Sequence, residues 1–258
     1  MAIMILPVTG LPGIKPGDDL ARLLASAISG SRIGVKPGDI LVVCQKVVSK
    51  AEGRVVDLRT VKPSALAEAW ASAHDKDARV IEVVLRESKR IVRMDGGHLI
   101  VETGPGWICA NAGVDESNAI EAGQVTLLPL DPDASAERLR KSLRGHVGVD
   151  LAIIVTDTFG RPWREGQVEF ALGVAGMQPL LDLRGTRDLN GHELRVTMIG
   201  VADELACAAG LAMEKDQGIA AVLIRGYRYR PPDDGAHAGA TPAGGRALIR
   251  ARENDMFR

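Results

Sequence analysis

The sequence predicts an α+β (mixed α/β) protein, in which mixed sheets and packed helices form one compact unit. Apolar runs of strand length, such as 40–44 and 151–155, alternate with segments whose apolar residues recur at helical spacing. Hydrophobic residues make up 46% of the chain but aromatic residues only 3%, so the interior must consist of Ala, Val, Leu and Ile. This composition favours layers of helix and sheet. At 258 residues the chain is long enough for one large domain or two closely joined ones, and we expect a single domain over 1–258 with possible sub-lobes.

The N-terminal half alternates predicted strands and helices. A strand at about 2–8 leads into a loop rich in Gly and Pro, after which Asp18 or Asp19 can cap a helix. A turn at 104–106 predicts a hairpin. The other predicted elements are strands at 40–44, 98–102 and 107–110 and helices at 64–73 and 77–91.

The C-terminal half begins with a rigid extended linker at 128–133, after which Ser135 opens a basic helix. Asp203 is a candidate cap for an alanine-rich helix that reaches Met213. Residues 227–245 have no periodicity, which predicts a mobile loop before a short basic helix. The predicted elements are a helix at 135–144, a strand at 194–201, a helix at 202–213 and a strand at 220–224.

The central stretch 150–164 concentrates chemistry at one point. A continuous apolar run breaks off into Thr156-Asp157-Thr158, followed by Gly160, Pro162 and two arginines, Arg161 and Arg164. We interpret it as a buried strand that leads into a polar loop. Its carboxylate, hydroxyls and guanidinium groups suit a metal and phosphate oxygens. The alternative is a buried aspartate that caps a turn, with surface arginines.

A second strand end resembles the first. The predicted strand at 107–110 is followed by Asn111-Ala112-Gly113-Val114-Asp115, and then by hydroxyl and amide groups. Two such ends could place Asp115 and Asp157 around one hard cation, since magnesium prefers one or two carboxylates with phosphate oxygens and water. A pair of aspartates that cap turns would explain the same pattern.

Two further segments have the residue types of a phosphate site. The loop at 10–19 could present backbone donors to a ligand, or could simply connect a strand to a helix. Lys46 and Lys50 follow a buried run and can place compact charges near phosphate, although single lysines are commonly surface residues.

Composition excludes several classes of partner. Lys plus Arg number 32 against 33 for Asp plus Glu, so no overall charge favours nucleic acid or an anionic membrane. Cys44, Cys109 and Cys207 are far apart in the sequence, as expected of core residues in a reducing cytoplasm. The apolar N-terminal run is too short to span a membrane and lacks the features of a signal peptide.

The common nucleotide and hydrolase motifs are absent from the sequence. It contains no phosphate loop ending in Gly-Lys-Ser/Thr and no Gly-x-Gly-x-x-Gly fingerprint. It also contains no Gly-x-Ser-x-Gly elbow and no His-Glu-x-x-His. Any nucleotide site must therefore be built in another way.

Five segments together resemble the coenzyme F-420-0:γ-glutamyl ligase family. In chain order they are GLPGIKPGDDL at 10–20, VSKAEGR at 48–54, NAGVDESN at 111–118, DTFGRPWREG at 157–166 and VADE at 201–204. The resemblance implies a GTP-dependent ligase that attaches L-glutamate to coenzyme F-420-0, a phosphodiester-linked deazaflavin, and then adds further glutamates through γ-carboxylates. It also implies two interwoven lobes and a cytoplasmic homodimer whose active site lies near the subunit interface.

The resemblance assigns roles to particular positions. Asp115 and Asp157 match ligands of one divalent cation, Mg²⁺ or Mn²⁺, and Thr158 matches a ligand of a second. Glu214 also falls where the second ion is expected, and the family pattern leaves room for a monovalent cation such as K⁺. The implied nucleotide contacts are Leu11, Pro12, Gly13, Ile14, Gln45, Lys46, Lys50, Asn118, Met213, Glu214, Lys215, Asp216, Gln217, Gly218 and Ile219.

The implied chemistry explains these residue types. A carboxylate condenses with an amine only after activation, here as an acyl phosphate, so cations must shield the γ-phosphate. Arg161 and Arg164 could clamp the anionic substrate, or could pair with nearby acidic side chains. Glu52 and Glu165 are candidates for the base that deprotonates glutamate. The alternatives are another metal- and nucleotide-dependent amide ligase or phosphotransferase, and a non-catalytic deazaflavin- or nucleotide-binding module.

Overall fold

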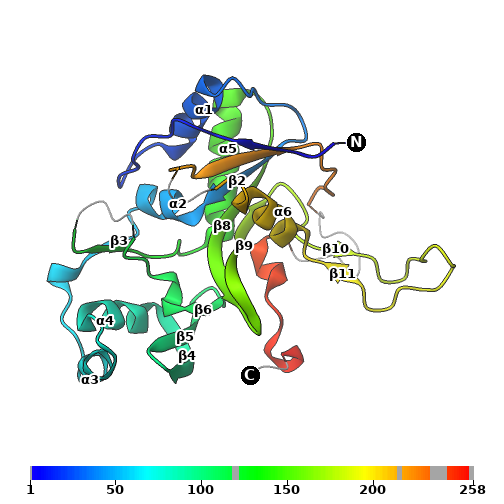
Figure 1. The fold of residues 1–258 in the computed structure, drawn as a ribbon. Helices are drawn as coiled ribbons and strands as arrows, with labels where there is room; N and C mark the ends of the chain where they lie inside the picture. Colours follow the sequence, from blue (N-terminus) through cyan, green and yellow to red (C-terminus); the bar gives the residue numbers. More distant parts are fainter. Residues whose placement is uncertain (1, 118–121, 214–216, 233–242, 256–258) are drawn as a thin grey trace.

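A five-stranded mixed sheet forms the centre of the larger of two lobes (Figure 1). The structure, a computed structural model, describes residues 2–117, 122–213, 217–232 and 243–255. β2 and β8 are parallel, and all other neighbouring strands are antiparallel. The predicted α+β class is confirmed. The strands in spatial order are β1 (Met4–Pro7), β12 (Ala221–Arg225), β2 (Ile40–Cys44), β8 (Ala152–Arg161) and β9 (Arg164–Ala175).

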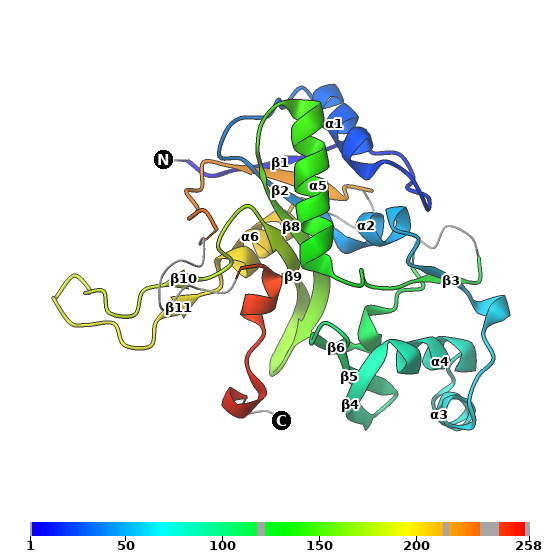
Figure 2. The ribbon, with the colours of Figure 1, turned by 180° about the vertical axis from the view of Figure 1, so that it is seen from behind.

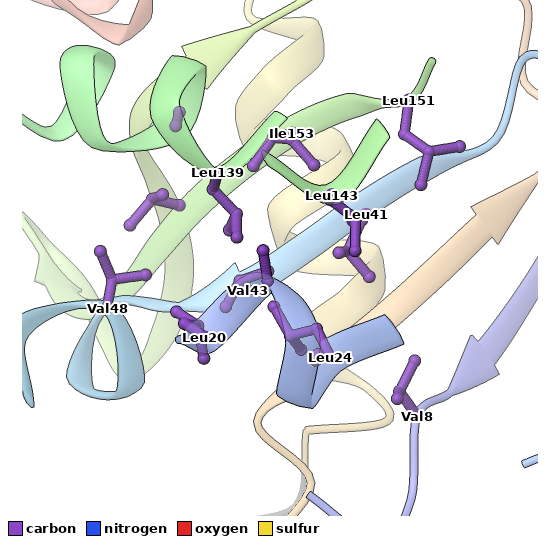
Figure 3. Packing of buried hydrophobic residues seen from close by; sticks show 14 of the residues in the cluster. Val8, Leu20, Leu24, Leu41, Val43, Val48, Leu139, Leu143, Leu151 and Ile153 are labelled. Carbon is purple, nitrogen blue, oxygen red and sulfur yellow. The ribbon is translucent and has the colours of Figure 1, made fainter. Parts of the chain in front are cut away.

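Both faces of this sheet are buried under helices. Alternate strand residues such as Leu41 and Ile153 face α1 (Leu20–Gly30) and α5 (Pro132–Val147), where Leu24 and Leu143 complete an aliphatic core (Figure 3). The intervening residues, including Val42 and Ile154, face α6 (Val201–Gly210). Burial on both faces explains why these strands are continuous apolar runs in the sequence.

The second lobe is built from the chain between β2 and α5. The three-stranded sheet β4 (Ser88–Asp95), β5 (His98–Thr103) and β6 (Ile108–Ala110) packs on α3 (Ala65–His74) and α4 (Ala78–Glu87). β3 (Val55–Asp57) and β7 (Gln124–Thr126) form a ribbon beside it. Arg54 ties this lobe down, because its guanidinium donates to the Leu128 carbonyl at 2.9 Å and to Glu87 at 2.5 Å.

A long arm extends from the larger lobe. The chain around β10 (Leu181–Asp182) and β11 (Met198–Ile199) projects away from the rest of the molecule (Figure 2). In the described parts of the chain, no helix is long and apolar enough to cross a bilayer. The remaining elements are α2 (Gln45–Ala51) and 3-10 turns at Leu58–Thr60, Asn111–Gly113, Gly245–Leu248 and Arg252–Asn254.

The prediction of a polar loop after the central strand is wrong. β8 continues through the Thr-Asp-Thr sequence to Arg161, because β9 supplies partners across a long antiparallel hairpin. Asp157 lies opposite Phe170, and Thr158 lies opposite Glu169. Asp157 and Thr158 therefore lie in a strand and not in the predicted loop.

Other predicted boundaries also change. The helix predicted at 77–91 ends at Glu87, because residues from Ser88 onward pair with β5. The basic helix begins at Pro132 rather than Ser135, with Asp131 as its cap, so the predicted linker at 128–133 is two residues shorter. Only Met198–Ile199 of the strand predicted at 194–201 is extended.

Two predictions near the C-terminus also need revision. Asp203 does not cap α6; it lies in the first turn and accepts a hydrogen bond from the Ala171 backbone N–H at 2.9 Å. The short basic helix consists of two 3-10 turns. The mobile loop predicted at 227–245 lies partly outside the described residues, since 233–242 are not described.

Candidate functional site

Three chain segments leave the main sheet at the same edge, which is formed by the C-terminal end of β2 and the N-terminal end of β12. The end of β2 pairs with Thr156 of β8 and lies beside the start of β12, where the Cys44 N–H donates to the Ala220 carbonyl at 2.9 Å. The loop after β1 contacts the end of α2, since the Gly17 N–H donates to the Ala51 carbonyl at 2.9 Å. The three predicted nucleotide segments therefore meet at one edge of the sheet.

A cavity of about 650 Å³ opens beside this edge, between the β8–β9 hairpin and the second lobe. It brings together side chains from three separate segments of the chain. Asp115, Asp157 and Thr158 all line it, and so does Lys46 at the start of α2. The predicted convergence of the two strand ends is thus present in the fold.

Lys46 forms an ion pair with Asp115 and donates a hydrogen bond to the Ser117 hydroxyl at 2.9 Å. Burial raises the pKa of Asp115, but hydrogen bonds from Lys46 and Ser117 outweigh it and hold that pKa below its usual range. Asp115 is therefore a carboxylate at neutral pH, and one cation already lies beside it.

Asp157 is in a different environment. Burial raises its pKa to about 7, and the neighbouring charges of Glu169 and Asp115 contribute in the same direction. A bound divalent cation would favour the ionised form of such a carboxyl group. A cation bound beside both groups would favour the ionised form of Asp157 and would meet an already ionised Asp115.

Glu169 is a site residue that the sequence did not reveal. Its carboxylate accepts hydrogen bonds from the hydroxyls of Thr158 at 2.7 Å and Thr156 at 2.9 Å. The proton of Thr158 is thereby directed to Glu169, and its oxygen lone pairs remain available to a cation. A single carboxylate within the apolar run 168–175 is the signal that could have identified it.

The donor set suits magnesium or manganese. It offers two carboxylates and one hydroxyl, and hard cations of this kind are completed by phosphate oxygens and water. Within the described residues, no group of three or more His, Cys, Asp or Glu side chains could hold a metal ion. The third predicted carboxylate, Glu214, and the nucleotide contact Asn118 lie outside the described residues, as do Lys215 and Asp216.

The first predicted nucleotide loop, 11–14, has two kinds of residue. Ile14 is buried in the core and Leu11 packs against it, so their side chains anchor the loop. Pro12 and Gly13 are exposed. We infer that any ligand contact here comes from the backbone.

α2 contributes two more of the predicted contacts. Gln45 is fully buried and its carbonyl oxygen accepts from Ser49 at 2.8 Å, while its Nε2 has no hydrogen-bond partner among the described residues. Burial, followed by the nearby charge of Lys46, lowers the pKa of Lys50. An unsatisfied buried amide such as that of Gln45 is costly, which is consistent with a ligand that accepts a hydrogen bond from its Nε2.

The segment 213–219 reaches a second, smaller cavity. Met213 lines this cavity of about 470 Å³ together with Glu169, and the two cavities adjoin at Thr158 and Gln167, which line both. Ile219 packs against the core. Gln217 and Gly218 are exposed.

The two arginines separate. Arg161 lines the larger cavity and donates to the Glu165 carbonyl at 3.0 Å, and its buried Nε has no partner among the described residues. Arg164 is exposed at the tip of the hairpin and does not line the cavity. The candidate bases also lie outside the cavity lining: Glu52 pairs with Arg138 at 2.6 Å, and Glu165 is exposed.

Sequence comparison identifies the family. The sequence profile of a family described as F420-0:Gamma-glutamyl ligase matches residues 10–226, which is most of the chain. The chain belongs to this family. Among similar curated proteins is coenzyme F420:L-glutamate ligase of Methanothermobacter thermautotrophicus, 44% identical over 100% of both chains. Coenzyme F420:L-glutamate ligase of Methanopyrus kandleri is 46% identical over 99% of this chain and 98% of its own.

A third relative has the same name and aligns with a smaller share of this chain. Coenzyme F420:L-glutamate ligase of Archaeoglobus fulgidus is 45% identical over 88% of each chain. The predicted membership of the F420-0:γ-glutamyl ligase family is therefore confirmed, and so is the prediction of an amide-forming enzyme.

Proposed function

We propose that this chain uses GTP to join L-glutamate to coenzyme F420-0 through an acyl phosphate. It then adds further glutamates through γ-linkages and releases GDP and phosphate at each step. The observation that carries this proposal is the meeting of Asp115, Asp157 and Thr158 at the sheet edge where the nucleotide segments converge. The names of the curated relatives support the choice of coenzyme F420 and glutamate as substrates.

The side chains of the cavity have complementary tasks. Asp115, Asp157 and Thr158 would hold Mg²⁺ or Mn²⁺, which supplies shielding of phosphate charge when bound. Lys46 can neutralise a phosphate oxygen once it leaves Asp115. The buried Nε of Arg161, which has no partner in the described parts of the chain, could donate to an anion of the acceptor.

The proposed reaction has two steps. The acceptor carboxylate attacks the γ-phosphorus, the bond to the β-phosphate oxygen breaks, and GDP leaves. The amine of glutamate, after losing a proton, then attacks the acyl carbon, and inorganic phosphate leaves with the electron pair of the broken C–O bond. The cavity serves this sequence by placing the reactants between the hairpin and the second lobe, beside the side chains that line it.

The test combines the chain with GTP, Mn²⁺, L-glutamate and the deazaflavin lactyl phosphodiester. We expect GDP release together with an acceptor mass increase of one or more glutamates. Asp157→Asn should lower kcat by about 10²–10³-fold. The substitution removes a carboxylate that would hold the cation, and the cation would shield the phosphate charge in the transition state. Glu68→Gln, an exposed carboxylate on α3, is the matched control and should retain full activity. GDP release with a different acceptor, or binding without turnover, would replace the proposal with one of its alternatives.

We also propose that the chain forms a homodimer through its long arm. Leu189 is fully exposed and Val196 is 88% exposed, on a segment with no covering element from the described chain. Exposed apolar side chains on a projecting ribbon are typical of a surface that another subunit covers.

A further inference from the structure

A third cavity, of about 580 Å³, lies where the C-terminal segment crosses the second lobe. Its lining is unusually basic for a chain whose acidic and basic residues are balanced. Among the described residues that line it, five are cationic and one is acidic. They are Lys89, Arg90, Arg246, Arg250 and Arg252, together with Glu102.

The C-terminal segment is fixed in this position by several contacts. The Gly245 N–H donates to Asp133 at 2.5 Å, and the Arg246 guanidinium donates to Asp131 at 3.1 Å. Ile249 packs in a small apolar cluster with Trp107. The cluster and hydrogen bonds therefore hold the segment against the β5–β6 turn, and the basic side chains that follow are held at the cavity.

The positive charge of this cavity is only partly neutralised. Glu102 pairs with Lys89 at 3.2 Å and with Arg90 at 2.9 Å, so the single carboxylate is shared by two cations. Arg250 and Arg252 are exposed and form no ion pair with any residue in the described parts of the chain. The cavity thus retains an excess of positive charge that an anionic ligand could neutralise.

The basic cavity adjoins the candidate active site. Ile108 lines the larger cavity, and its direct partner across the β5–β6 pair, Glu102, lines the basic one. Directly opposed residues of an antiparallel pair are about 5 Å apart at Cβ. The same sheet face continues from Arg93 beside the active site to Arg90 in the basic cavity. A chain that leaves the active site along this face therefore reaches the arginines.

We propose that the basic cavity binds the anionic tail of the acceptor, a short chain of γ-linked glutamates. This inference rests on the proposed function. Each glutamate joined through its γ-carboxylate keeps a free α-carboxylate, so the tail carries a regular series of negative charges. With the terminal γ-carboxylate in the larger cavity, the earlier residues extend along β5 and β6 toward Arg250 and Arg252. The cavity accordingly favours acceptors that already carry glutamates.

Direct binding provides a test that needs no turnover. Isothermal titration of the full chain with γ-linked triglutamate should show binding that weakens about tenfold in Arg250→Ala/Arg252→Ala, because two carboxylate contacts are lost. Arg22→Ala/Lys36→Ala removes two exposed cations that line neither the basic cavity nor the larger one, and should leave the affinity unchanged. Equal affinities for the wild type and the Arg250/Arg252 variant would overturn the proposal.

Kinetics separate this inference from the proposed function. The Arg250/Arg252 variant should raise KM about tenfold for an acceptor with two glutamates and leave kcat and the first addition to F420-0 unchanged. A wild type that ligates normally, with a variant whose KM is unchanged for both acceptors, would contradict the tail site alone. A wild type that performs no ligation but binds triglutamate through the two arginines would contradict the proposed reaction and retain the tail site.

Discussion

Glu169 determines which way the hydroxyl of Thr158 points. Because Glu169 accepts the hydroxyl proton of Thr158, Glu169→Ala should let this hydroxyl rotate, so that its lone pairs are no longer directed at a bound cation. We expect the affinity for Mn²⁺ to fall about 10–100-fold, measured by titration of the protein with the ion. Glu165→Gln, at the exposed hairpin tip, is the control. Unchanged affinity in Glu169→Ala would show that Thr158 needs no such orientation.

Asp203 links α6 to β9 and predicts a pH effect on stability. Burial raises its pKa above the ordinary value of 3.8, against the hydrogen bond from Ala171. The folded state therefore binds more protons than the unfolded state between these two pKa values, and the free energy of unfolding falls as pH rises through that window. Asp203→Asn cannot ionise, so its stability relative to the wild type should increase from pH 4 toward neutrality. Calorimetry at several pH values would measure this, and a constant difference would contradict it.

At this scale the sequence revealed the two aspartates but not their surroundings. Asp115 and Asp157 were identifiable because each follows an apolar run and stands among small or hydroxylated residues. The ion pair between Lys46 and Asp115 joins segments 69 positions apart, and no local pattern indicates such a contact. The separation of Arg161 from Arg164 depends on the direction of the hairpin, which the sequence also leaves open.

Among the elements, α5 and β9 approach each other so closely that the β9 residue facing the start of α5 must be a glycine. A Cβ at Gly173 would lie 2.1 Å from the Pro132 carbonyl oxygen, which belongs to the backbone and cannot rotate away. Gly173→Ala should therefore lower the free energy of unfolding by about 3 kcal/mol or more, measured by urea denaturation.

Gly145, which lies within α5, is the matched control for the substitution at Gly173. A Cβ there would meet nothing within 4 Å, and the residue is exposed within α5. Gly145→Ala should stabilise the protein by about 0.5–1 kcal/mol through helix propensity. The same substitution thus has opposite signs at the two positions, and similar effects at both would refute the close approach of α5 to β9.

Element boundaries were predictable where one periodicity dominated. β2 has the predicted bounds because both of its faces are buried and its apolar run ends sharply. The helix predicted at 77–91 extended too far, because the alternation of exposed and half-buried residues in β4 begins within the same charged segment. β8 was cut short because its polar half depends on pairing with β9.

The whole molecule should be a dimer of 27.4 kDa chains if the arm is covered by a second subunit. Leu189→Asp/Val196→Asp would place four charges in a symmetric interface and weaken association at least about a thousandfold. Light scattering after size-exclusion chromatography would then give a monomer mass. Leu66→Asp, on the exposed side of α3, should leave the dimer intact. A wild type that is monomeric at high concentration would refute this assembly.

The arrangement of the lobes lay beyond sequence reasoning from residues alone. Composition and periodicity indicated mixed helices and strands, and the family resemblance added two lobes. Strand order follows from contacts such as Ile40 with Ala152 and Val43 with Ala221, which join distant parts of the chain. These pairings are set by the total burial of both sheet faces, a property of the whole chain rather than of any segment.

The position of β12 has a consequence for biosynthesis. This late strand lies between β1 and β2, so the N-terminal strand has no neighbour in the sheet until residue 225 has been made. Because a nascent chain emerges from its N-terminus, the edge of β2 that pairs with β12 stays exposed until residues 221–225 have been made. A ribosome stalled before β12 would hold a chain with an open, apolar strand edge, and such chains are prone to aggregate and to engage chaperones.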